Sequence, residues 1–292
     1  MSARTLIRRI AASPRAAGSV LVAPGVLWLL AFFVAPIAIM LGYSVMQRGV
    51  YGGVEAVLTT EQYRRLVDPL YLGILARTVL WSLACTAACL VLGYPVAFAI
   101  ARARRWRRML LFLVVLPFWT SFLVRMFAMI FLLRDTGLIN SVLLALGIVD
   151  QPLTLLYTPF AVLLGLVYGF LPLMILPIYA SLERLDDNLL EAAEVLGARG
   201  FERFRRVVLP LSMPGVVAGL LLTFIPSLGS FVPSDLLGGA KQAMVGNIIQ
   251  NQFTVARDWP FGSALSFVLM LVVLSPVLLY LRRRDTLEVK TR

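Results

Sequence analysis

Long apolar runs alternate with short polar segments along almost the whole chain. Six runs are long enough to cross a bilayer, whose hydrocarbon core takes about 20 mostly apolar helical residues. They cover about 20–45, 74–101, 109–133, 159–182, 214–237 and 261–281. Backbone polar groups in hydrocarbon must be paired within their own segment, which favours helices. The pattern therefore predicts an all-α membrane protein with six transmembrane helices in one domain, 20–281.

Composition excludes the main alternative, a soluble globular protein. Hydrophobic residues make up 60% of the 292 residues and charged residues 14%. Ordinary soluble domains have about 45–50% and about 25%. The first apolar run is too long for a cleaved signal peptide, so we expect it to be a membrane helix.

The distribution of charge predicts the orientation of the chain. The 27 Lys and Arg residues outnumber the 15 Asp and Glu residues and cluster between the apolar runs. With the N-terminus inside, 19 basic residues fall in cytoplasmic segments and 7 in outer connections. The positive-inside rule then predicts two basic cytoplasmic tails, 1–19 and 282–292. The clusters lack interleaved aromatic residues, so we expect membrane lipid rather than nucleic acid beside them.

The residues that usually carry catalysis are scarce. The chain has no histidine, which excludes His-dependent catalysis and His-ligated metals. Cys85 and Cys89 share one helical face, which leaves soft-metal binding or oxidant sensing open, but close helix packing is the favoured interpretation. We therefore predict no catalytic residue and no metal site.

One polar segment, 183–213, is longer and more regular than an ordinary connection. Asp186 or Asp187 can cap a helix, and Gly197 stands where a helix commonly ends in a left-handed residue. The apolar face of that helix is formed by Leu189, Ala192, Ala193 and Leu196. We expect a second short helix over 201–208, after which prolines direct the chain back into the membrane. Such a segment either docks against another protein or lies on the membrane surface.

The same segment resembles the EAA loop of permease subunits of bacterial ABC importers. The resemblance rests on Glu191-Ala192-Ala193, on Gly197 and on Leu209-Pro210, at the spacing of that family. It implies a type I ABC importer permease bundle in the bacterial inner membrane, with 183–213 as the cytoplasmic coupling loop. We call these residues the coupling segment. Leu196 would belong to its docking face.

The resemblance also implies partners. They are a cytosolic ATPase dimer, a second permease subunit and a periplasmic or lipid-anchored substrate-binding protein. The chain has no phosphate-binding Gly-x-x-x-x-Gly-Lys-Ser/Thr sequence, so ATP and Mg²⁺ would bind the partner ATPase. This chain would bind no cofactor and would not be an enzyme.

A finer resemblance points to the substrate. The stretches 116–133, 137–140, 228–239 and 258–262 are similar to the first permease subunit of spermidine/putrescine importers. Ser230 departs from that family, which often has an acidic residue there. Opines, phosphonates, thiamine and ferric iron are alternative cargoes. A self-contained channel or secondary transporter is a further alternative, but the inverted repeats typical of the latter are not visible.

A few residues are candidates for the substrate path. Arg125 and Asp235 are charges at membrane depth, which require a partner or an aqueous cavity. We favour an ion pair between them, with a substrate-facing Asp235 as the alternative. Aromatic faces that could hold an ammonium group belong to Trp119, Tyr168, Phe231 and Trp259. Ser230 lies in the same stretch as Phe231 and Asp235.

Overall fold

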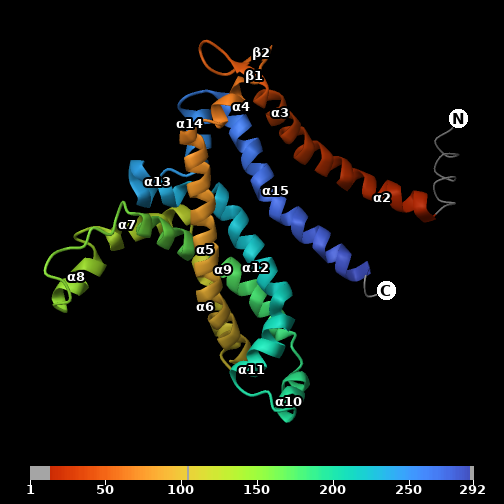
Figure 1. Cartoon of the computed structure of the whole chain (residues 1–292), viewed down its shortest axis with the longest axis vertical. Helices are drawn as coiled ribbons and strands as arrows, with labels where there is room; N and C mark the ends of the chain where they lie inside the picture. Colours follow the sequence, from red (N-terminus) through yellow and green to blue (C-terminus); the bar gives the residue numbers. More distant parts are fainter. Residues whose placement is uncertain (1–13, 104, 290–292) are drawn as a thin grey trace. The chain divides into compact units, whose positions relative to one another are not determined.

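The computed structural model describes residues 14–103 and 105–289, most of them helical (Figure 1). The chain divides into two compact units. One comprises the described residues of Met1–Arg65 together with Gln252–Val268, and the other those of Leu66–Asn251 together with Leu269–Arg292. The predicted basic tails, 1–19 and 282–292, lie partly outside the described residues.

The first unit begins with a long apolar helix. It consists of α2 (Pro14–Leu29), a π-helical turn η1 (Leu30–Val34) and α3 (Ala35–Ser44). An antiparallel hairpin of β1 (Met46–Arg48) and β2 (Val54–Leu58) follows, and then α4 (Glu61–Leu66). The first turns of α15 (Trp259–Val289) complete the unit.

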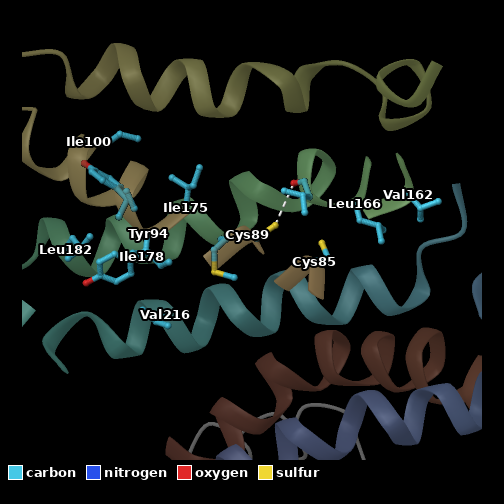
Figure 2. Packing of buried hydrophobic residues seen from close by; sticks show 14 of the residues in the cluster. Cys85, Cys89, Tyr94, Ile100, Val162, Leu166, Ile175, Ile178, Leu182 and Val216 are labelled. Carbon is cyan, nitrogen blue, oxygen red and sulfur yellow. Dashed lines mark hydrogen bonds between the residues drawn. The ribbon is translucent and has the colours of Figure 1, made fainter. Parts of the chain in front are cut away.

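Three long helices form the core of the second unit: α5 (Pro69–Arg102), α9 (Pro159–Glu183) and α12 (Leu209–Gly229). Figure 2 shows Cys85, Cys89 and Tyr94 of α5 in one buried cluster with Leu166, Ile175 and Ile178 of α9. A Cβ on Gly219 of α12 would lie 2.8 Å from the sulfur of Met174. Small residues therefore allow these helices to approach closely, as is common in membranes.

Shorter elements connect and flank the three long helices. Between α5 and α9 they are α6 (Arg107–Val115), η2 (Leu116–Trp119), α7 (Phe122–Leu133) and α8 (Leu138–Ala145). Between α9 and α12 lie α10 (Asp187–Val195), α11 (Phe201–Arg203) and the π-helical turn η3 (Phe204–Val208). After α12 come α13 (Val232–Gly238), η4 (Gly239–Gln242) and α14 (Val245–Thr254).

Four helices in the described part of the chain are long and apolar enough to cross a membrane. They are Val22–Ser44, Pro69–Arg102, Pro159–Glu183 and Phe201–Gly229. A bent pair, Arg107–Trp119 with Phe122–Ala145, gives a fifth if it is one span, and the apolar part of α15, Trp259–Ser275, is shorter. Six spans therefore remains a prediction from sequence.

Two expected helices differ from the structure. The stretch 109–133 is not one helix, because the chain is extended at Thr120 and bends by 93° between the segments on either side. Pro117, which cannot donate a backbone hydrogen bond, lies in the 3₁₀ turn that precedes this bend. The stretch 214–237 is also interrupted: the fifth helix begins at Phe201 and ends at Gly229, and α13 is separate.

Candidate functional site

The first helix of the coupling segment is α10, and both of its ends match the expectation. The Asp186 carboxylate accepts a hydrogen bond from the Asn188 N–H at 2.9 Å, so Asp186 is the cap. At the other end Gly197 has φ +89°, and the next N–H, of Ala198, donates to the Ala193 carbonyl at 2.9 Å. These bonds satisfy backbone groups that a helix end leaves unpaired.

The exposed face of α10 differs from the predicted one. Leu190 and Ala193 are buried against the chain's own helices, whereas Glu191 and Ala192 are exposed. Large apolar side chains are nevertheless left uncovered around the end of the helix. We call this exposed group the apolar tip: Leu189, Val195, Leu196 and Phe201. Leu196 and Val195 are both 87% exposed.

The coupling segment is tied to the membrane helices rather than loosely attached. Glu194 of α10 forms an ion pair with Arg203 of α11 at 2.9 Å, across the turn at Gly197. The Phe204 ring packs edge-on against Tyr94 of α5, with centroids 5.5 Å apart. Tyr94 in turn shares a 2.8 Å hydrogen bond with Ser212 of α12. A displacement of α10 would therefore be transmitted to α5 and α12.

The second helix of the segment is not short, contrary to the expectation for 201–208. Phe201 begins a continuous helix that runs through η3 into α12 and ends at Gly229. Leu209 and Pro210 are the first two residues of α12, directly after the π-helical turn. They lie inside the helix rather than at a turn back into the membrane.

The fifth helix is broken where the 228–239 stretch begins. Ser230 is extended after Gly229, and α13 starts at Val232. The Asn247 side chain closes the break: its amide nitrogen donates to the Phe231 carbonyl at 3.1 Å, and its oxygen accepts from the Met244 N–H at 2.9 Å. A Cβ on Gly246 would lie 2.8 Å from the Gly229 carbonyl oxygen, so only glycine fits there. Interrupted helices of this kind are found at the substrate sites of membrane transporters.

Comparison with known proteins decides the family. Residues 90–284 match the family described as "Binding-protein-dependent transport system inner membrane component". The chain belongs to this family. It is 44% identical over 264 residues to the spermidine/putrescine transport system permease protein PotB of Escherichia coli (strain K12), covering 90% of this chain and 96% of PotB. PotB of Haemophilus influenzae is 43% identical, covering 90% and 92%.

More distant similarities agree. The inner membrane ABC transporter permease protein YdcU of Escherichia coli is 34% identical over 230 residues, which is 74% of this chain and 73% of YdcU. A crystal structure of a bacterial ABC transporter that imports the acidic polysaccharide alginate superimposes with a TM-score of 0.68, covering 96% of this chain and 99% of that one. At 17% identity this match shows the fold alone. The chain is thus an inner-membrane permease subunit of an ABC importer with the type I permease fold.

Within this permease subunit the expected ion pair between Arg125 and Asp235 is not formed. Asp235 is exposed on α13, and no ion pair in the described part of the chain includes either residue. Arg125 is only 8% exposed, and its Nε and Nη1 atoms have no hydrogen-bond partner. Its guanidinium carbon instead lies among three aromatic rings. The distances to the ring centres are 5.3 Å for Phe118, 5.3 Å for Phe122 and 5.9 Å for Tyr168.

The other path candidates do not gather in one place. Tyr168 is 40% exposed and faces Arg125, so its ring is already occupied by a cation of the chain. Trp119 is 74% exposed and contacts Phe112 edge-on at 5.7 Å. Ser230 and Phe231 are half-buried at the break of the fifth helix. The candidates that do lie together are Arg125 with Tyr168, and Ser230 with Phe231 and Asp235.

The 258–262 stretch has a structural role within the first unit. The Asp258 carboxylate accepts from the Phe261 N–H at 3.2 Å, which caps α15, and pairs with Arg65 at 2.8 Å. The Arg65 guanidinium also lies 4.1 Å from the centre of the Phe261 ring. Trp259 packs beside Tyr43, with centroids 6.5 Å apart.

Sequence reasoning missed Asn247 and Thr78. The Thr78 hydroxyl accepts from the Val245 N–H at 2.9 Å, so α5 and α14 are joined by the same strip of residues that Asn247 organises. A polar amide directly after Met244-Val245-Gly246 was the available signal. Cys85 and Cys89 are fully buried in the core, where the Cys89 thiol donates to the Val167 carbonyl (Figure 2). Their burial agrees with the packing interpretation.

Proposed function

We propose that this permease subunit imports a polyamine of the spermidine/putrescine type. The observation that carries this assignment is the 44% identity, over 90% of the chain, to a permease named for those two substrates. The exposed Asp235, beside Phe231 and the broken fifth helix, supports it. A carboxylate and an aromatic face are the groups that bind ammonium ions.

The proposed partners follow from the coupling segment. Its apolar tip would dock in a groove of a cytosolic ATPase, two copies of which bind ATP and Mg²⁺ and carry out the hydrolysis. A second permease subunit would complete the path, and a periplasmic or lipid-anchored protein would deliver the substrate. Both chain ends would then be cytoplasmic. The Glu194–Arg203 pair and the Phe204–Tyr94 contact support rigid transmission from α10 to the bundle.

The four arginines of the coupling segment that follow Gly197 divide into two groups under this proposal. Arg203 and Arg206 pair with Glu194 and Glu202 of the same chain, at 2.9 and 3.0 Å. Arg199 and Arg205 take part in no ion pair within the described part of the chain. Of these four, Arg199 and Arg205 are therefore the ones available to pair with acidic residues of an ATPase.

A substitution at the apolar tip tests the docking. Leu196→Glu places a charge on a side chain that is 87% exposed, and Val50→Glu does the same at a 90% exposed valine of the hairpin as a control. We expect Leu196→Glu to abolish co-purification with the ATPase subunit and Val50→Glu to leave it intact. Retention of the ATPase by Leu196→Glu would show that the tip is not the docking site.

A second experiment tests the cargo. Asp235→Asn should lower spermidine uptake by reconstituted complexes at least about tenfold, which corresponds to one lost charge-assisted interaction. The exposed Asp150 gives the control variant Asp150→Asn, for which we expect wild-type uptake. Uptake by Asp235→Asn at the wild-type rate would remove this carboxylate from the path. A binding protein that is stabilised by an anion and not by spermidine would contradict the polyamine assignment itself.

A further inference from the structure

A cavity of about 280 Å³ lies behind the coupling segment, within the second unit. It is bounded by the end of α5, the start of α6, the end of α9, α10 and η3. Its lining consists of Phe98, Ala101, Arg102, Arg107, Leu182, Glu183, Leu185, Leu190 and Val208. The apolar tip is a separate, exposed group, because none of its residues lines this cavity.

The charges of the cavity are unbalanced. Two arginines face a single carboxylate, and one of them, Arg107, is paired with Glu183 at 2.9 Å. A second Arg107 nitrogen donates to the Ala101 carbonyl at 3.0 Å, while its Nε is buried with no partner. Arg102 lies over the Phe98 ring at 5.0 Å and belongs to no ion pair in the described part of the chain. Within the described residues, the exposed Arg102 guanidinium therefore has no acidic partner and the buried Arg107 Nε has no hydrogen-bond acceptor.

We propose that this cavity binds a phosphate-bearing anion through Arg102 and Arg107. Guanidinium groups present paired N–H donors that match phosphate oxygens, and the vacant donors are those of these two residues. The volume lies just below the range of about 300–1,000 Å³ typical of drug-sized ligands, so it suits a phosphate or glycerophosphate group rather than a nucleotide. Leu182 and Leu185 add apolar lining beside these donors.

A phospholipid headgroup and free phosphate are the two sources of such an anion. The cavity is located where α5 and α9 end and the fifth helix begins, beside a cluster of arginines. Basic pockets at the cytoplasmic ends of membrane helices bind anionic headgroups. Leu190 of α10 and Val208 of η3 are part of the wall. A bound anion would therefore contact the coupling segment and stabilise its position against the bundle. This regulatory consequence rests on the proposed function, whereas the binding itself does not.

Native mass spectrometry of the purified transporter complex tests the binding. The complex is taken from vesicles of phosphatidylcholine with phosphatidylglycerol, and retained phosphatidylglycerol is counted. We expect Arg102→Gln to lower retention at least about fivefold, as for loss of a charge-assisted contact. Arg108→Gln is the matched control, because Arg108 is an exposed neighbour that does not line the cavity. Equal phosphatidylglycerol retention by the two variants would overturn the proposal. It would also be overturned if the wild-type complex retained no phosphatidylglycerol and bound no phosphate.

Glu183→Gln separates anion binding from a structural role of the ion pair. Removal of the carboxylate frees Arg107 and should raise phosphatidylglycerol retention, whereas a purely structural pair would give lower retention. Millimolar inorganic phosphate distinguishes the two sources: lipid that is retained in its presence assigns the site to the headgroup, whereas no retained lipid together with bound phosphate assigns it to the free anion. Reduced retention in Glu183→Gln, in a complex that still assembles, would contradict the proposal. Loss of ATPase docking in Leu196→Glu would leave this result unaffected.

Discussion

Glycine is required at position 197 by the backbone conformation and not by crowding from a neighbouring side chain. Its φ is +89°, and a Cβ placed on it would have no atom of the chain within 4 Å. An L-residue in this conformation costs about 1 kcal/mol. The same position faces open space beside the proposed ATPase site. A small substitution and a large charged one should therefore have different consequences.

Gly197→Ala should lower the free energy of unfolding of the complex by about 1 kcal/mol and leave most of the transport, because only the backbone is strained. Gly197→Asp should insert normally but uncouple ATP hydrolysis from uptake, since it adds a charge at the docking face. Thermal unfolding and reconstituted uptake distinguish the two effects. Wild-type transport by Gly197→Asp would place the ATPase contact elsewhere.

Arg125 shows a different constraint at the same scale. A buried cation at membrane depth costs several kcal/mol without a partner, yet three aromatic rings are its neighbours and Nε and Nη1 have no acceptor. Cation–π contacts contribute about 0.5–2 kcal/mol each, so they offset part of this cost. Asp235 offsets none of it, because the two residues form no ion pair.

We expect Arg125→Gln and Asp235→Asn to act independently. In a double-mutant cycle on thermal unfolding of the complex, the coupling free energy should be below about 0.5 kcal/mol, as for residues that share no contact. Rescue of Asp235→Asn by Arg125→Gln would instead indicate a pair formed in another state of the transport cycle.

At the scale of single elements, proline positions explain the irregular helices. The π-helical turns η1 and η3 end at Val34 and Val208, each two residues before a proline, Pro36 and Pro210. A helix with proline loses one backbone hydrogen bond and must avoid a clash with the carbonyl four residues earlier. A single wider turn accommodates both effects without ending the helix.

Pro210→Ala tests this explanation. Restoring the N–H should let η3 revert to α-helix and rotate α11 relative to α12 by about 100°, which would separate Phe204 from Tyr94. We expect normal insertion but transport reduced at least several-fold. Pro214→Ala, in the same helix and without an adjacent π turn, should have a much smaller effect. Equal effects of both substitutions would show that proline does not cause the π turn.

Asp258 supports a second element, the start of α15. Loss of a cap costs about 1 kcal/mol. The Asp258 carboxylate is also only 1% exposed and pairs with Arg65, which is 37% exposed, so losing this ion pair adds to the cost. We expect Asp258→Ala to lower the free energy of unfolding by about 2 kcal/mol and Asp258→Asn, which keeps an acceptor, by about half as much. Glu202→Gln removes the exposed ion pair with Arg206 and should change the free energy of unfolding by less than about 0.5 kcal/mol. Thermal unfolding in detergent measures the loss of stability in all three variants. Equal losses for Asp258→Ala and Glu202→Gln would show that the buried Asp258–Arg65 pair stabilises the protein no more than an exposed pair.

The elements that sequence predicted well are those fixed by local signals. Hydropathy over 74–101 and 159–182 corresponds to α5 and α9 within a few residues, and the Asp186 and Gly197 signals gave both ends of α10. The breaks after Trp119 and Gly229 were missed because their surroundings are as apolar as a continuous span. The second break is closed by Asn247, which lies beyond α13 and η4 in the sequence, and a hydropathy pattern carries no such information. The missing Arg125–Asp235 pair likewise depends on tertiary packing.

At the scale of the whole molecule, the orientation in the membrane is a prediction from the distribution of charge. The 19 to 7 division of Lys and Arg predicts that the coupling segment is on the cytoplasmic side and the β1–β2 hairpin on the outer side. The apolar tip, the cavity lined by Arg102 and Arg107, and the proposed ATPase would then share one compartment. The hairpin and Asp235 would face the compartment from which substrate arrives.

Labelling with a membrane-impermeant thiol reagent checks this orientation. The two native cysteines are fully buried in the core, so Cys85→Ala and Cys89→Ala give a background without competing thiols. A cysteine at Gly200, in the turn after α10, should react only when the cytoplasmic face is accessible, and one at Gly53, in the hairpin, only from outside. Both glycines have open space at the Cβ position, and both have positive φ, so the two variants carry a similar backbone strain. If both cysteines were labelled from the same side, the number of membrane crossings between them would be even, which contradicts the prediction. If Gly200→Cys were labelled from outside and Gly53→Cys from the cytoplasm, both chain ends would be outside.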